Sequence, residues 1–261
     1  MSLATKHKPV KKTNYSEIAG YYDRVRGGHR RFFGGGLKAI AGFGKIRDCR
    51  LILDIGCGTG QQALAFAKHF DTGIIGVDCS REMLEKAKKK DRKGRVGWVL
   101  GNAEHLPFKG GSFDCAYMTF VVHHVGDKRR AFREARRVCR KGGSFVITTS
   151  SHARLRRTPY SLFPGVYAID SARFTNMPKL AGMVKASGFS DVRQRHVVFG
   201  RERLTLGRAL KNADSRFIST FTLISKEDFE RGKKIFEKRI KRRHGRVIDR
   251  VLEANFVIAR K

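Results

Sequence analysis

Short apolar runs alternate with amphipathic segments along most of the chain. Seven of these runs predict β-strands, at residues 51–55, 73–77, 96–100, 114–121, 144–149, 191–199 and 254–259. Apolar residues at helical spacing follow the first, second and fourth runs and precede the sixth. Strands that alternate with helices in this way are typical of a parallel sheet covered by helices on both faces. The pattern predicts an α/β fold with a doubly wound, mostly parallel sheet of seven strands.

Capping residues mark where two of the helices begin. Ser80 is a predicted N-cap, with Glu82 in the first turn and a lysine run at 88–90, an order of charges that suits the helix dipole. Asp127 is predicted to cap the helix after the fourth strand, and Gly142-Gly143 is predicted to end it. Both helices are therefore expected to begin directly after their caps.

Two segments interrupt the alternation of strands and helices. Residues 151–172 contain two prolines and three aromatic residues and are predicted to be irregular, whereas residues 202–246 are predicted to be mostly helical. We expect a single domain, with a core at 49–150, these two inserts on the substrate side and a closing strand at 251–261.

Composition places the chain among ordinary globular proteins. Of its 261 residues, 41% are hydrophobic and 30% are charged. No apolar run approaches the roughly 20 residues needed to span a bilayer, and residues 1–12 lack the apolar core of a secretion signal. The five cysteines show no CxxC spacing, which is typical of a reduced intracellular protein without a zinc site. We therefore expect a cytoplasmic protein with no resident metal.

The charge is strongly basic. Lysine and arginine number 56 against 23 aspartate and glutamate, for a net charge of +33. The excess is concentrated in residues 1–50, 128–157 and 201–250, and one predicted helix face carries six arginines, Arg129, Arg130, Arg133, Arg136, Arg137 and Arg140. Such a surface should attract nucleic acid, another polyanion or an anionic membrane face at low salt. A general basic bias of the source proteome and a solvated helix face are the alternative explanations.

A glycine-rich turn, Asp54-Ile55-Gly56-Cys57-Gly58-Thr59-Gly60, follows the first predicted strand. Glycines in such a turn allow positive φ and close approach to a nucleotide, so the turn alone fits a nicotinamide dinucleotide as well. The GxGxG spacing, with Gln61 next, differs from GxGxxG. The Asp54 carboxylate would also oppose a pyrophosphate. S-adenosylmethionine carries a sulfonium and an ammonium cation without phosphate, so the acid favours this cofactor.

A second carboxylate, Asp78, ends the second predicted strand, 18 residues after Gly60. An acid about 20 residues beyond the glycine turn is placed to accept hydrogen bonds from both ribose hydroxyls. An aspartate after a strand can also serve only to cap the next helix. Its separation from the glycine turn favours the ribose role.

Several motifs in sequence order resemble the class I S-adenosylmethionine-dependent methyltransferases, and in particular the ubiquinone/menaquinone-biosynthesis (type 11) group. They are LDIGCGTGQ, GVDCSREMLEKAK, GNAEHLPFKGGSFDCAYMTFVVHHV and RRVCRKGGSFVITT, which together cover residues 50–150. Residues 14–33 are similar to the helical amino-terminal lid of that group, so a lid is expected within residues 1–48. Beyond residue 150 only the strand order carries over. The resemblance implies a Rossmann-like fold, S-adenosylmethionine as the cofactor and methyl transfer as the reaction.

The resemblance also implies which residues contact the cofactor. The glycine turn would hold the methionine part, Asp78 the ribose, and Asn102 with Ala103 the adenine. Many relatives have aspartate where this chain has Asn102, and the neutral amide makes a weaker contact. Tyr15 or Tyr22 would close over the cofactor. The full predicted set is Tyr22, Asp54, Gly56, Cys57, Gly58, Gly60, Asp78, Cys79, Met83, Asn102, Ala103, Glu104 and Phe120.

His123 and His124 are the candidate catalytic residues. They follow the fourth strand, at the carboxyl edge of the sheet where ligands bind in open α/β folds. Methyl transfer needs the nucleophile, methyl group and sulfur in line, and a base only if the acceptor must lose a proton. A histidine pair is frequent in the group across different substrates, so a packing or cofactor-shelf role is the alternative.

The acceptor is predicted to be a small molecule, walled by the two inserts. The alternative is RNA, such as tRNA or rRNA, or another polyanion, bound through Arg154, Arg156, Arg157 and residues 226–250. No separate RNA-binding module and no alternation of aromatic and basic residues supports that alternative. A non-catalytic binding protein would leave the nearly complete set of cofactor motifs unexplained. The acceptor atom and the oligomeric state do not follow from the sequence.

Overall fold

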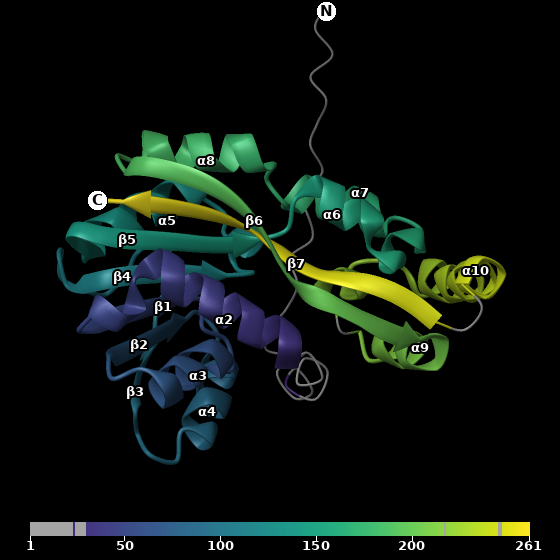
Figure 1. The fold of residues 1–261 in the computed structure, drawn as a ribbon, viewed down its shortest axis with the longest axis horizontal. Helices are drawn as coiled ribbons and strands as arrows, with labels where there is room; N and C mark the ends of the chain where they lie inside the picture. The colour runs from purple at the N-terminus through teal and green to yellow at the C-terminus, as the bar shows by residue number, and fades with distance from the viewer. Residues whose placement is uncertain (1–22, 24–29, 217, 245–246) are drawn as a thin grey trace, which may run out of the picture.

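The computed structural model describes residues 23, 30–216, 218–244 and 247–261. Figure 1 shows the arrangement of the elements within these ranges. The strands are β1 Leu51–Ile55, β2 Gly73–Asp78, β3 Val96–Leu100, β4 Phe113–Thr119, β5 Cys139–Thr149, β6 Ser190–Thr205 and β7 Val247–Arg260. The helices are α2 Arg30–Gly44, α3 Gln61–His69, α4 Arg81–Lys90, α5 Lys128–Val138, α6 His152–Arg157, α7 Val166–Arg173, α8 Met177–Ala186, α9 Leu206–Asp214 and α10 Lys226–His244. Short 3-10 helices are η1 Ile46–Asp48, η2 Val122–His124, η3 Pro159–Leu162 and η4 Ser219–Thr222.

The described strands form one seven-stranded sheet in the order β3-β2-β1-β4-β5-β7-β6. The neighbours from β3 to β5 pair in parallel, and β7 pairs antiparallel with both β5 and β6. The predicted doubly wound, mostly parallel sheet is confirmed. The strand order reverses beside β1, so the carboxyl ends of β1 and β4 lie at the switch point where open α/β sheets bind ligands.

Two apolar layers cover the sheet. On one face, α5 and α8 pack Phe132 and Leu180 against strand residues such as Leu53. On the other face, α2 and α3 contribute Ile40 and Phe66. Alternate residues of each central strand enter opposite layers, which explains why these strands are apolar throughout rather than alternating. The predicted caps are confirmed: Ser80 accepts from Met83 N and Asp127 accepts from Arg130 N.

A helical cap lies beyond the sheet, which we define as α6, η3, α7, α9, η4 and α10 together with the outer halves of β6 and β7. In Figure 1 the long β6–β7 ribbon runs from the sheet into this cap. Its own core contains twelve buried residues: Tyr160, Phe163, Val166, Leu204, Leu206, Ala209, Ala213, Phe221, Phe229, Phe236, Ile240 and Ile248. The two predicted inserts therefore meet in one packed unit.

Three boundary predictions were wrong. Residues 151–172 are largely helical rather than irregular, because their aromatic side chains pack against the second insert. The last two strands are longer than predicted, since each continues as half of the ribbon. The helix α5 ends at Val138 rather than at Gly142-Gly143, which lies within β5. There Gly142 N donates to Lys261 O and Lys261 N donates to Gly143 O, so pairing with the chain's last residue extends β5.

Within the described part of the chain, no helix combines the length and apolar character needed to cross a membrane.

Candidate functional site

The glycine turn between β1 and α3 is fastened to β2. Gly56 N and Cys57 N both donate to Val77 O, at 2.7 and 3.1 Å. Gly56 has φ of +73°, and a Cβ there would come within 2.5 Å of the Val121 side chain. Gly58 also has positive φ, but a Cβ at Gly58 would meet no atom of the described residues within 4 Å. The predicted turn residues therefore differ in role: Gly56 permits tight packing, whereas Gly58 faces open space that a ligand can enter.

Asp78 connects the end of β2 to this turn. Its Oδ2 accepts from Gly58 N at 2.8 Å and its Oδ1 accepts from Ser80 N at 2.9 Å. Burial raises the pKa of this carboxyl, and the backbone donors partly oppose the shift. Each carboxylate oxygen can accept a second hydrogen bond. Because Ser80 is the cap of α4, the Asp78 side chain is not needed for that function.

Asp54 lies at the carboxyl end of β1 and is only 2% exposed. Burial raises its pKa to about 7, and the charge of Asp78 acts in the same direction. Four buried oxygens, Asp54 Oδ2, Tyr117 Oη, Thr119 Oγ1 and Thr148 Oγ1, have no hydrogen-bond partner within the described residues. The register pairs Asp54 with Tyr117 and Thr119 with Thr148. Because Tyr117 and Thr119 are two residues apart on β4, all four side chains lie on one face of the sheet. Buried polar atoms without partners indicate a place where a polar ligand completes the hydrogen bonding.

Phe120 directly follows β4 and adopts a left-handed backbone with φ of +52°. Its N–H donates to Thr148 O at 2.9 Å. This backbone conformation is costly for a residue with a bulky side chain, and such strain is concentrated at functional sites. Two further predicted cofactor residues follow β2. Cys79 is exposed, whereas Met83 lies in α4 and is only 1% exposed.

The predicted adenine-side residues lie in the loop after β3. Asn102 Oδ1 accepts from Glu104 N at 2.9 Å, which folds the loop into a tight turn. Glu104 Oε1 accepts from Gly126 N and Asp127 N, at 3.0 and 3.1 Å. The Glu104 carboxylate thus joins this loop to the start of α5. Ala103 is half-buried against the apolar layer.

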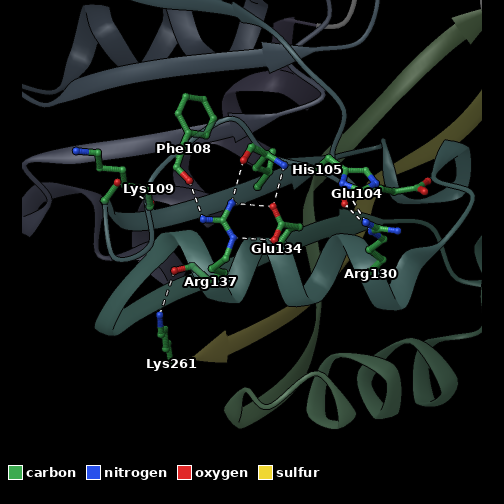
Figure 2. A network of polar contacts seen from close by, with 10 residues as sticks. Glu104, His105, Phe108, Lys109, Arg130, Glu134, Arg137 and Lys261 are labelled. Atoms are coloured by element: carbon green, nitrogen blue, oxygen red, sulfur yellow. Dashed lines mark hydrogen bonds and ion pairs between the residues drawn. The ribbon is translucent and has the colours of Figure 1, made fainter.

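Arginines of α5 hold the same loop from below, as Figure 2 shows. Arg137 donates to Leu106 O at 2.9 Å and to Phe108 O at 2.7 Å, and it pairs with Glu134 at 2.7 Å. Glu134 in turn accepts from Leu106 N, and the Arg137 hydrogen bond lowers the pKa of Glu134. Arg130 donates to Glu104 O at 3.2 Å. Two of the six arginines of this face, Arg130 and Arg137, therefore brace the loop.

Replacing Arg137 tests this bracing. We expect Arg137→Ala to lower the free energy of unfolding by about 1–2 kcal/mol, because two loop carbonyls and Glu134 lose a charged donor at a partly exposed position. Arg133→Ala is the matched control: Arg133 is exposed on the same helix and has no hydrogen bond or ion pair with the described residues. Its effect should stay within about 0.5 kcal/mol. Equal urea-denaturation midpoints for the two variants would contradict the role of Arg137.

Asp23, the one described residue before α2, contacts the glycine-turn region. Its Oδ1 accepts from Thr59 Oγ1 at 2.5 Å and from Gln61 Nε2 at 2.8 Å, and its Oδ2 pairs with Lys90 Nζ at 2.8 Å. Burial raises the pKa of this carboxyl, but the three hydrogen bonds outweigh burial and hold the pKa below its ordinary value. The predicted lid residues Tyr15 and Tyr22 lie outside the described residues.

The histidine pair lies in η2, at the carboxyl end of β4. The rings of His123 and Phe174 stack with centroids 3.9 Å apart and an interplanar angle of 17°. Arg173 Nη2 lies 3.1 Å from His124 Nδ1. Two consecutive residues at the end of α7 thus contact two consecutive histidines. No local signal in the sequence points to these partners, since Arg173 lies 49 residues from His124.

These features fit S-adenosylmethionine better than a dinucleotide. The space before Gly58 is bordered by Asp78, and Asp54 is buried close by with its pKa raised. A cation beside Asp54 would favour the ionised form of its carboxyl group. A pyrophosphate would instead place negative charge close to the two carboxylates, Asp54 and Asp78, and repel them. The buried oxygens of Thr119 and Thr148 can accept or donate toward the charged ends of an amino acid.

A family model described as a methyltransferase domain matches residues 53–147. The chain is 30% identical over 237 residues to a demethylmenaquinone methyltransferase of Roseiflexus sp. (strain RS-1), a match that covers 79% of this chain and 98% of that protein. Seven other curated relatives match over shorter stretches, which cover 28–61% of those proteins' own lengths.

Solved structures with the same fold include two methyltransferases. One, from Anabaena variabilis, is a putative methyltransferase of an antibiotic biosynthesis pathway; it is 22% identical with a TM-score of 0.67, and the match covers 85% of this chain and 95% of that one. The other is phosphoethanolamine N-methyltransferase 2 of Haemonchus contortus, in complex with S-adenosyl-L-methionine. It is 20% identical with a TM-score of 0.61, and the match covers 95% of this chain and 57% of that one.

Proposed function

Because the chain belongs to the class I S-adenosylmethionine-dependent methyltransferases, we propose that it transfers a methyl group from this cofactor to a small-molecule acceptor. The observation that carries the proposal is the carboxyl edge of the sheet. There the open space before Gly58 is bordered by Asp78, close to the buried Asp54.

Each residue of this edge has a proposed task. Asp78 would accept from the ribose hydroxyls, and the glycine turn with Asp54 would hold the cationic methionine part. Asn102 and Ala103 would border the adenine on the loop that Arg137 braces. The bound cofactor supplies an electrophilic methyl group on a sulfonium. The protein's contribution to its transfer is to hold the acceptor in line and to exclude water.

The position of the helical cap supports the proposal that the acceptor is a small molecule. It lies next to the carboxyl edge and contacts both histidines, through Arg173 and Phe174. A packed cap beside the sheet can enclose a molecule of modest size, which is the usual form of a small-molecule site. The Roseiflexus relative is named for a quinone-type acceptor, and this agrees with the proposal.

The charge-based alternative, RNA or another polyanion, receives no support from the relatives described above. The arginine face of α5, its strongest feature, is largely occupied: Arg136 donates to Gly188 O, Arg140 pairs with Asp114, and Arg137 braces the loop after β3. Arg157 pairs with Glu253. These contacts give a structural reason for much of the basic excess near the sheet.

Calorimetry with the purified chain tests the cofactor part of the proposal. We expect S-adenosylmethionine and its demethylated product to bind, and NAD not to bind. A screen of small metabolites with labelled methyl donor, run beside total RNA, tests the acceptor. Label should enter the metabolite fraction. NAD binding without S-adenosylmethionine binding, or label only in RNA, would contradict the proposal.

A further inference from the structure

A chain of buried polar groups leads from the helical cap to His124. Thr220 in η4 donates to Asp170 Oδ1 in α7. One turn later in α7, Arg173 Nη1 donates to Thr220 Oγ1 at 3.3 Å. The same guanidinium reaches Ser219 Oγ at 3.4 Å and His124 Nδ1 at 3.1 Å through Nη2. Residues of η4 thus hold the Arg173 guanidinium, which contacts one nitrogen of a candidate catalytic residue.

The groups in this chain are almost completely withdrawn from solvent. Asp170 and Arg173 are each 6% exposed and Thr220 is 2% exposed. A buried charge is costly unless it is paired and hydrogen-bonded, and here the Arg173 charge lies near that of Asp170. Thr220 bridges the two buried charges, and burying them is unnecessary for packing the mostly apolar core of the cap, so the position of Arg173 needs another explanation.

The chemistry of the guanidinium group supplies that explanation. The Arg173 guanidinium carries five N–H donors and no acceptor, and it stays protonated. At 3.1 Å from Arg173 Nη2, His124 Nδ1 must therefore present a lone pair. A proton on Nδ1 would place two N–H groups against each other. The contact thus selects the neutral ring with its proton on Nε2, as a hydrogen bond to one ring nitrogen commonly sets the tautomer of histidine.

We propose that Arg173 is a positioning residue, which fixes His124 as the neutral Nε2–H tautomer so that this N–H donates a hydrogen bond to an oxygen of the methyl acceptor. The proposal rests on the proposed function and narrows it. A donor and a nearby guanidinium stabilise negative charge, so the site suits an oxygen-bearing acceptor such as a phenolate or enolate rather than a protonated amine. His124 in this state does not serve as a general base through Nδ1.

Nitrogen NMR on the unmodified protein tests the tautomer directly. In a ¹⁵N-labelled sample at neutral pH, long-range correlations distinguish protonated from unprotonated ring nitrogens, and His124→Gln identifies the relevant signals. We expect a protonated Nε2 and an unprotonated Nδ1. A protonated Nδ1, or two protonated nitrogens, would overturn the proposal. Calorimetry with S-adenosylmethionine on the same sample tests the proposed function separately, since cofactor binding does not depend on the tautomer.

Variants separate positioning from a merely structural role. Arg173→Met combined with Asp170→Asn removes both buried charges together, so neither is left unpaired. In this double variant the His124 signals should shift toward the average of the two tautomers. Arg173→Lys keeps a donor and should retain the original spectrum. Arg156→Met, on α6, removes an exposed arginine that contacts Tyr167 instead and should leave the spectrum unchanged. An unchanged spectrum in the double variant would show that Arg173 does not set the tautomer.

Discussion

Phe163→Ala is expected to destabilise the helical cap by about 3–5 kcal/mol, the cost of truncating a fully buried phenylalanine. Phe163 is 1% exposed and lies at the centre of the cap core, with ring centroids 4.7 Å from Phe221 and 5.5 Å from Phe229. A Cβ on Gly232 would come within 2.4 Å of the Phe163 ring, so α10 packs directly on it. The Phe163 ring centroid also lies 5.8 Å from that of Phe236 and 6.4 Å from that of Tyr160, so several elements border the cavity that its truncation would leave.

Hydrogen exchange measures where this loss occurs. Amides of α9 and α10 should exchange faster in the Phe163→Ala variant, whereas those of β1 and β4 should keep their protection, because the sheet has separate apolar layers. Ile235→Ala is the control: Ile235 lies on α10 but is 40% exposed, so its truncation should have little effect. Equal loss of protection in the sheet and the cap would contradict a separately packed cap.

The central fold could be predicted because its signals are local. Five apolar strands, the glycine turn and the caps Ser80 and Asp127 each lie within a few residues of the feature that they specify. The cap could not be predicted in this way. Its core joins residues such as Tyr160 and Phe236, whose rings stack 5.6 Å apart although the sequence separates them widely. Residues 151–172, which contain two prolines, are largely helical and contribute Tyr160, Phe163 and Val166 to this core.

In the candidate site, too, some features follow from local sequence patterns and others depend on contacts between distant residues. The positions of Asp54, Asp78 and Gly58 follow from strand ends and turns, which sequence patterns reveal. The partners of the histidines do not, because Arg173 and Phe174 reach them from α7 across the sheet edge. The arginine face of α5 illustrates a different limit. Its periodicity predicted a polar helix face, but only the fold shows that Arg130 and Arg137 on this face donate to loop carbonyls.

Asp78→Ala is expected to weaken S-adenosylmethionine binding by about 1.5–3 kcal/mol, or roughly 10- to 150-fold in the dissociation constant. Two losses contribute. The ribose hydroxyls would lose a charged acceptor, and Gly58 N would lose its 2.8 Å hydrogen bond to Asp78 Oδ2. The fold should survive, since α4 keeps its Ser80 cap and the Gly56 N contact to Val77 O does not involve the carboxylate.

Calorimetry on a set of aspartate variants separates these contributions. Asp78→Asn keeps one oxygen acceptor and the side-chain volume, so its loss should fall between those of the parent and the alanine variant. Asp71→Ala is the matched control, because Asp71 is exposed just before β2 and has no hydrogen bond or ion pair with the described residues; its affinity should equal that of the parent. If Asp78→Ala binds the cofactor as tightly as Asp71→Ala does, the carboxylate serves only to join the glycine turn to β2. Thermal unfolding of each variant shows whether the substitution has disrupted the fold. A drop in affinity with an unchanged melting temperature would assign the effect to the contact between Asp78 and the ribose or to the ordering of Gly58. The asparagine variant would then separate the effect of the negative charge from that of the side-chain geometry.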